Sequence, residues 1–195
     1  MKEAQDKIKE KLNLKEGYTL SWGGQFKNME RANKRLMIIV PLTLLGVFLI
    51  LWKVFGRLAP TLIVFASVPF AAVGGILALY VRNLHLSVSA GVGFIALIGI
   101  ALLNSLVLMN VLLTDKSDLS VEEKVKKGTL SRLRPVLMTA LVAGLGFLPM
   151  ALNTGIGAEV QRPLATVVIG GLMSSTFLTL FLLPTAFMSW SKRGK

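Results

Sequence analysis

The chain has 195 residues, no cysteine and a formal net charge of +12, and 53% of its residues are apolar. Its mean hydropathy of +0.66 favours a membrane protein over a water-soluble domain. The lack of cysteine excludes disulfides and thiolate metal sites. The positive charge does not indicate nucleic acid, because the basic residues lie between apolar runs and not along one soluble face. Composition therefore predicts a protein that is embedded in the lipid bilayer.

Residues 1–35 are polar and include nine basic residues. Met1–Leu12 has apolar residues at four-residue spacing, which predicts an amphipathic helix, and Gly17–Trp22 alternates enough to predict a short strand. A helix then begins near Phe26 and runs into the first apolar run. Because these elements cannot bury a core alone, they are expected to be the end of an extracytoplasmic α/β domain. The chain is accordingly expected to be the C-terminal piece of a longer protein.

Five runs without Asp, Glu, Lys, Arg or His follow, each near or above the roughly 20 residues that cross a bilayer. Backbone groups in lipid must pair internally, so such runs read as helices. The fold class expected is all-α and membrane-integral, with a membrane domain at 36–191. The runs are Leu36–Trp52, Leu58–Val81, Leu86–Thr114, Pro135–Ala158 and Pro163–Ser191, and they predict spans at about 36–54, 58–81, 86–114, 135–153 and 163–190.

Basic residues gather in three of the connecting segments and are rare in the other two. Cytoplasmic segments carry the excess of Lys and Arg, so the loop 115–134 and the tail 192–195 are expected in the cytoplasm, and the N-terminus outside. The rich segments contain Lys53 and Arg57; Lys116, Lys124, Lys126, Lys127, Arg132 and Arg134; and Lys192, Arg193 and Lys195, whereas the intervening turns contain only Arg82 and Arg162.

The loop 115–134 has apolar residues among its charges, which predicts a short amphipathic helix on the membrane surface that ends at Gly128. The second and fourth runs open with the same R-L-x-P pattern, at 57–60 and 132–135. Proline fits a first helical turn because its missing N–H has no partner there in any case. Arg132 and Arg134 are expected to lie at the cytoplasmic interface of the membrane and to anchor this helix end there.

Asn104 is a polar residue near the middle of the third run. An amide at that depth needs a hydrogen-bond partner and should face protein or water. It either bonds a neighbouring helix or lines a polar transport pathway, and the residues alone leave both open. Thr139 in the fourth run is a weaker candidate of the same kind, because threonine can bond its own helix backbone.

Small residues and prolines inside the runs are candidates for helix packing and for flexing points. Small residues let membrane helices approach closely, which assigns packing to Gly74, Gly75, Gly170 and Gly171. Pro69 and Pro149 interrupt helical hydrogen bonding and are candidate hinges. An intramembrane enzyme is excluded, because the single histidine, His85, lies at a turn with no catalytic partner. No metal site or cofactor is expected.

Several segments resemble, in order, the C-terminal part of resistance–nodulation–division (RND) efflux transporters of the heavy-metal branch. The matching segments are GGQFKNMERANKRL, VPFAAVGGILAL, SAGVGFIALIGIALLNSLVLM, RLRPVLMTALVAGLGFLPMAL and TGIGAEVQRPLATVVIGGLMSS. The resemblance implies that 1–35 ends a periplasmic porter domain and that the five spans are the eighth to twelfth of twelve. It also implies a homotrimeric proton antiporter of the bacterial inner membrane, which exports metal cations through a periplasmic adaptor and an outer-membrane channel.

The same resemblance places the proton-carrying acids in the half of the protomer that this chain lacks. Where the drug-exporting branch has a lysine and the copper/silver branch a glutamate, this chain has Leu103, which favours the cobalt–zinc–cadmium type. The polar pathway would map to Asn104 and Thr139, with Arg132 at its cytoplasmic mouth. Two alternatives stay open: a truncated or split membrane subunit with a structural or assembly role, and an RND pump for organic compounds.

Overall fold

The computed structural model describes residues 25–115 and 119–193, and the chain divides into two units, 1–35 and 36–195. In the first unit the described residues, 25–35, form the opening turns of helix α2 (Gln25–Phe55). The helix expected in Met1–Leu12 and the strand expected in Gly17–Trp22 lie outside the described residues. The α/β character expected for this region therefore stays a prediction.

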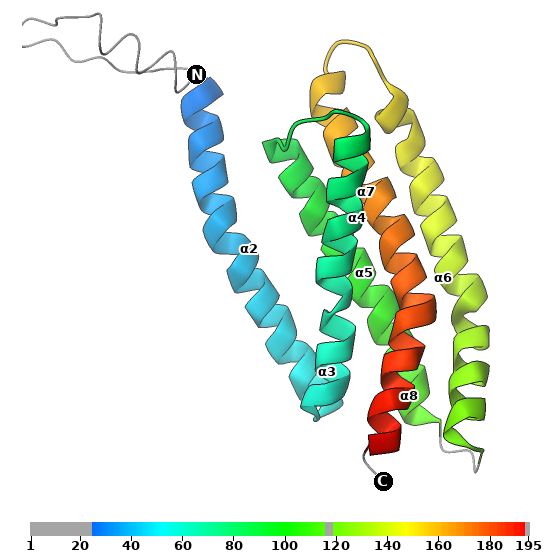
Figure 1. Ribbon diagram of the computed structural model, residues 1–195. Coiled ribbons are helices and arrows are strands. Elements are labelled where there is room, and N and C mark those ends of the chain that lie inside the picture. Colours follow the sequence, from blue (N-terminus) through cyan, green and yellow to red (C-terminus); the bar gives the residue numbers. More distant parts are fainter. Residues whose placement is uncertain (1–24, 116–118, 194–195) are drawn as a thin grey trace, which may run out of the picture. The chain divides into compact units, whose positions relative to one another are not determined.

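The second unit is a helical bundle, and the part of it that the structure describes contains no strand (Figure 1). Five stretches of helix are long and apolar enough to cross a membrane: Lys34–Phe55, Leu58–Val81, Val88–Thr114, Val121–Leu152 and Ala158–Lys192. The prediction of five long apolar helices is thereby confirmed. After α2 the elements are α3 (Leu58–Phe65), α4 (Ser67–Val81), α5 (Val88–Thr114), α6 (Val121–Leu152), α7 (Ala158–Phe177), the π-helical turn η1 (Leu178–Leu182) and α8 (Leu183–Arg193).

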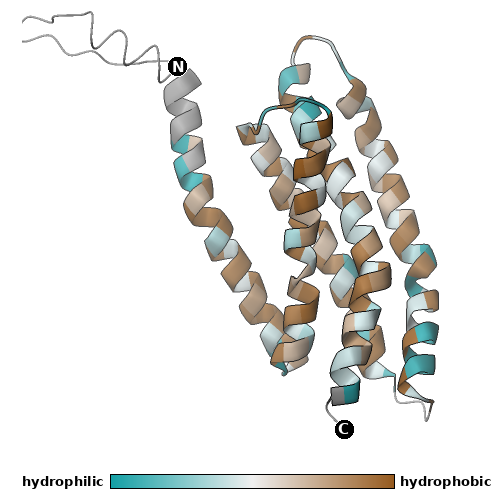
Figure 2. Ribbon diagram, in the orientation of Figure 1, coloured by the Kyte–Doolittle hydropathy of each residue, from teal (hydrophilic) through white to brown (hydrophobic). Residues whose placement is uncertain are grey.

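Helix α7 is the centre of the bundle and packs against α4, α5 and α6. The α2–α3 turn, the α5–α6 connection and the end of α8 lie at one end of the bundle, and the α4–α5 and α6–α7 turns lie at the other (Figure 1). Hydropathy follows this arrangement, since the middle of the bundle is largely apolar and hydrophilic residues gather toward its ends (Figure 2). The three segments rich in Lys and Arg thus share one end.

Glycines bring α7 into close contact with α4 and α5. A Cβ on Gly74 would lie 2.7 Å from the carbonyl oxygen of Gly170, and a Cβ on Gly170 would lie 2.8 Å from that of Gly74. A Cβ on Gly171 would collide with the side chain of Leu97 in α5. Such close approach increases dispersion contacts, which must hold helices together where lipid removes the hydrophobic driving force. The Ser174 hydroxyl adds a 2.8 Å hydrogen bond to the Phe70 carbonyl.

The helix that contains the fourth uncharged run begins earlier than expected. Ser120 and Glu123 form a capping box that starts α6 at Val121, and the helix continues through Gly128 and Pro135. The prediction of a separate surface helix that ends at Gly128 is therefore wrong, as is that of Pro135 in a first turn. Gly128 is buried, and a Cβ there would lie 2.7 Å from Leu112 Cδ2, so this glycine permits helix contact and does not end the helix.

Two prolines alter the helices that contain them. The second span is split at Ala66, three residues before Pro69, because proline offers no N–H to the carbonyl four residues earlier and its ring crowds that carbonyl. In the fifth span the π-helical turn η1 ends two residues before Pro184, and the Leu183 N–H donates to the Leu178 carbonyl. Proline kinks and π-bulges are recognised sources of helix irregularity. Pro149, by contrast, lies within the last turn of α6, which continues to Leu152.

Arg82, the C-cap residue of α4, joins three helices at the end opposite the basic segments. Its guanidinium donates to the Thr166 hydroxyl of α7 at 2.8 Å and to the Ala151 carbonyl of α6 at 2.7 Å. Ala151 is in the last turn of α6, where carbonyls lack partners within the helix and a cation is favoured by the helix dipole. Arg82 therefore caps α6 from another helix.

We expect Gly74→Leu to reduce the amount of folded protein sharply, because the new side chain would meet the α7 backbone and overpacking costs about 1–3 kcal/mol or more. Gly99→Leu is the matched control, since nothing lies within 4 Å of a Cβ at Gly99. The measurement is the monodisperse fraction of full-length protein in detergent by size-exclusion chromatography. Equal yields of the two variants would contradict the packing argument.

Arg82→Met should lower the thermal midpoint of the purified protein, because hydrogen bonds from a charged donor contribute about 1.5–3 kcal/mol. Arg57→Met serves as the comparison: Arg57 is exposed, and among the described residues its side chain makes no hydrogen bond. Surface substitutions of that kind usually change stability by less than about 0.5 kcal/mol. A midpoint for Arg82→Met no lower than that for Arg57→Met would show that the Arg82 bonds contribute nothing.

Candidate functional site

Asn104 lies inside the bundle and not on its surface. Its side chain is only 8% exposed, and its amide nitrogen has no hydrogen-bond partner among the described residues. A buried donor without a partner costs about 1–3 kcal/mol. Such groups in native proteins call for an explanation by water, an ion or a functional role. The structure thus leaves Asn104 as a polar group in need of a partner at the depth of the membrane.

Leu103, the residue before Asn104, faces the outside of the bundle. Leu103 is 62% exposed within this chain, while Asn104 is buried. Successive residues of a helix project about 100° apart, so one faces outward and the next inward. At the position where the RND resemblance implies a charged group in other branches, this chain therefore presents an aliphatic side chain on its outer surface.

A polar contact between Thr179 and Ser105, which is next to Asn104 in the sequence, was not predicted from the sequence. Ser105 and Thr179 are fully buried, and their hydroxyl oxygens lie 3.2 Å apart, which joins α5 to η1. Thr176, about one turn before Thr179, is also buried and its hydroxyl has no partner among the described residues. Among the buried polar side chains of α5 and α7–η1 are thus Asn104, Ser105, Thr176 and Thr179. The signal available in the sequence was Pro184, which disturbs the turn that contains Thr179.

Thr139, unlike Asn104, lies on the surface of the bundle. It is exposed on α6, and its hydroxyl donates to the Val136 carbonyl of its own helix at 2.8 Å. No hydrogen bond of the described residues joins it to Asn104. The two residues assigned to one polar pathway are therefore not linked within this chain, and Thr139 instead faces whatever covers the outer surface of α6.

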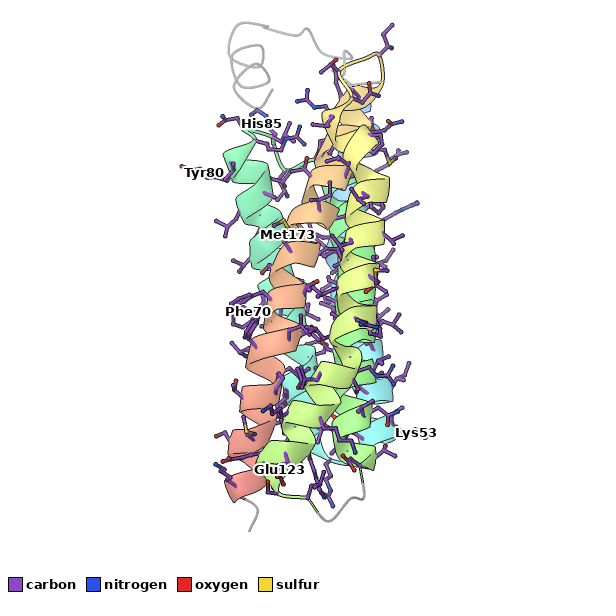
Figure 3. All side chains as sticks on the ribbon, turned by 90° about the vertical axis from the view of Figure 1, so that its right-hand side faces the viewer. Lys53, Phe70, Tyr80, His85, Glu123 and Met173 are labelled. Atoms are coloured by element: carbon purple, nitrogen blue, oxygen red, sulfur yellow. The ribbon has the colours of Figure 1, made fainter. Side chains whose placement is uncertain are left out.

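Arg132 and Arg134 lie on α6 where its uncharged run begins. Arg132 is half-buried and Arg134 is exposed. Lys53 and Glu123 lie toward one end of the bundle, and Tyr80 and His85 lie toward the opposite end (Figure 3). In the described parts of the chain, no group of three or more His, Cys, Asp or Glu residues is placed to hold a metal ion.

Comparison with known proteins places this arrangement in a family. Residues 1–191 match the AcrB/AcrD/AcrF family. The chain is 50% identical over 186 residues to the cobalt-zinc-cadmium resistance protein CzcA of Cupriavidus metallidurans, covering 95% of this chain and 18% of CzcA. It is 52% identical over 195 residues to protein HelA of Legionella pneumophila, covering 99% of this chain and 18% of HelA. The chain thus spans about a fifth of the length of these relatives.

A solved structure agrees with the sequence relatives. The crystal structure of a heavy metal efflux pump superposes with a TM-score of 0.81 at 42% identity, over 98% of this chain and 19% of the pump. Identity at that level over nearly the whole chain confirms the resemblance to heavy-metal RND permeases. The chain therefore belongs to the AcrB/AcrD/AcrF family of RND transporters.

Proposed function

We propose that this chain is the C-terminal membrane part of an inner-membrane pump that exports heavy-metal cations in exchange for protons. The observation that carries the proposal is the 50% identity to CzcA, a cobalt-zinc-cadmium resistance protein, along 95% of this chain. The nickel and cobalt resistance protein CnrA of Cupriavidus metallidurans is likewise 50% identical over 183 residues. The cation efflux system protein CusA of Escherichia coli is more distant, at 38% identity over 204 residues.

The proposed pump takes its proton-carrying groups from outside this chain. The five uncharged runs contain no Asp, Glu, His, Lys or Arg, and intramembrane proton relays are built from Asp, Glu or His. The acids are therefore assigned to the remainder of the protomer, in the half that precedes these helices. By family resemblance the working unit is a homotrimer that engages a periplasmic adaptor and an outer-membrane channel.

The proposed orientation has the basic end of the bundle in the cytoplasm. The α2–α3 turn, the α5–α6 connection and the end of α8 lie there (Figure 1). These segments and the helix ends beside them carry Lys53, Arg57, Lys124, Lys126, Lys127 and Lys192. Excess Lys and Arg marks the cytoplasmic side. Arg132 would then stand at the cytoplasmic mouth, and the Arg82 cap would face the periplasm.

Within this part of the pump we assign the polar groups of α5 and α7–η1 to the elements that move during transport. The Asn104 amide nitrogen has no hydrogen-bond partner among the described residues, and Thr179 lies in a π-helical turn, a form of helix frequently found at functional sites. A buried donor without a partner is free to bond water or a moving neighbour in another state of the pump. Thr139, exposed on α6, is proposed to meet the missing half of the protomer.

The direct test is Asn104→Leu in the full-length protein, which we expect to lower growth in zinc, cobalt or cadmium without lowering the amount of protein in the membrane. Leucine removes the amide while keeping a similar volume. Asn110→Leu is the control, because Asn110 lies on the same helix and is exposed. The readouts are the inhibitory metal concentration and the immunoblot signal. Unchanged resistance would assign Asn104 to helix packing alone.

A further inference from the structure

A long groove runs between α6 and the last span, and the proposed function does not use it. Its lower part has a volume of about 800 Å³ and lies between the start of α6 and α8. Its upper part, of about 320 Å³, lies between the middle of α6 and α7. Leu180 and Phe181 line both parts, so the two are consecutive along one seam.

The two parts of this groove differ in chemistry. The upper part is lined by aliphatic and aromatic side chains, with Thr176 as its one polar residue. The lower part adds Lys126, Glu122 and Lys192 to an apolar wall that includes Leu130 and Met188. A phospholipid has an anionic headgroup attached to hydrocarbon chains. The groove matches this chemistry, because its upper part is apolar and its lower part contains lysines.

The depth of each part in the membrane matches this division. The uncharged run of α6 begins at Pro135; the lower part of the groove precedes it and the upper part follows it up to Gly144. From Lys126 to Gly144 the helix rises about 27 Å, more than the roughly 15 Å of one leaflet's hydrocarbon. The lower part therefore lies at headgroup level and the upper part within the acyl chains.

We propose that this groove binds an anionic phospholipid, with its phosphate at Lys126 and an acyl chain along the seam to Gly144. Lys126 is exposed and makes no hydrogen bond or ion pair within the described residues. Lys192 already donates to Glu122 at 2.7 Å, so it closes the cytoplasmic edge of the groove and leaves Lys126 as the principal phosphate contact. Basic pockets between membrane helices on the cytoplasmic side are known to favour anionic headgroups.

Thr129 supports the same assignment. It lines the lower groove one turn above Lys126, and its hydroxyl has no partner among the described residues. Rotation about χ1 would offer this hydroxyl to a phosphate or ester oxygen. A helix of another protein would instead present apolar side chains at this level, and it would leave both Lys126 and the Thr129 hydroxyl unsatisfied.

The headgroup contact is tested by native mass spectrometry of the purified full-length protein with added phosphatidylglycerol or phosphatidylcholine. We expect phosphatidylglycerol to bind more tightly, and Lys126→Glu to weaken its binding by about fivefold or more. Lys127→Glu is the matched control, since it makes the same charge change on the next residue, which does not line the groove. Equal affinity for the two lipids, or equal effects of the two variants, would overturn the proposal.

The acyl-chain contact is tested by filling the upper groove. Nothing lies within 4 Å of a Cβ at Gly144 or at Gly146, and only Gly144 lines the groove. Gly144→Leu should therefore fold normally and reduce phosphatidylglycerol binding, while Gly146→Leu should leave it unchanged. If Gly144→Leu leaves lipid binding intact but disrupts the oligomer, the groove binds protein and the lipid proposal fails. Metal resistance is not part of this readout, so the test is separate from that of the pump function.

Discussion

Contact between α7 and its neighbours through small residues is the constraint on which the rest of the bundle depends. In hydrocarbon, helices gain nothing by hiding apolar surface from lipid, so their association relies on close dispersion contacts and interhelical hydrogen bonds. Gly74 and Gly170 each face the other's carbonyl oxygen, and Gly171 faces Leu97. The pair α4–α7, held in this way, then fixes where α5 and α6 can pack.

Two of the hydrogen bonds between described helices lie where a backbone irregularity or a helix end provides a partner. Arg82 bonds the Ala151 carbonyl because the last turn of α6 has no internal donor for it. Ser105 bonds Thr179 in the π-helical turn before Pro184. Between these links the helices meet through apolar side chains.

Much of the membrane region was predictable because lipid acts on every residue of a run. The five apolar helices and the basic end of the bundle follow from the absence of charge over long stretches and from the positions of Lys and Arg. The first and last residues of the helices were less predictable, because helix ends lie where the chain leaves the lipid for water. Gly128 read as a helix end, yet α6 passes through it, since the capping box at Ser120 starts the helix and the glycine admits Leu112 of α5.

The sequence by itself determined the solvent, the number of spans and, through its motifs, the family, because each of these depends on composition or on the order of residues along the chain. Only the tertiary structure decided which polar residues meet. Asn104 and Thr139 are both polar residues within apolar runs. In the part of the chain that the structure describes, the buried Asn104 amide nitrogen has no partner, whereas Thr139 is exposed and bonded to its own helix. Rotation about the helix axis separates them, and that rotation is set by the packing of neighbouring helices, which no local pattern specifies.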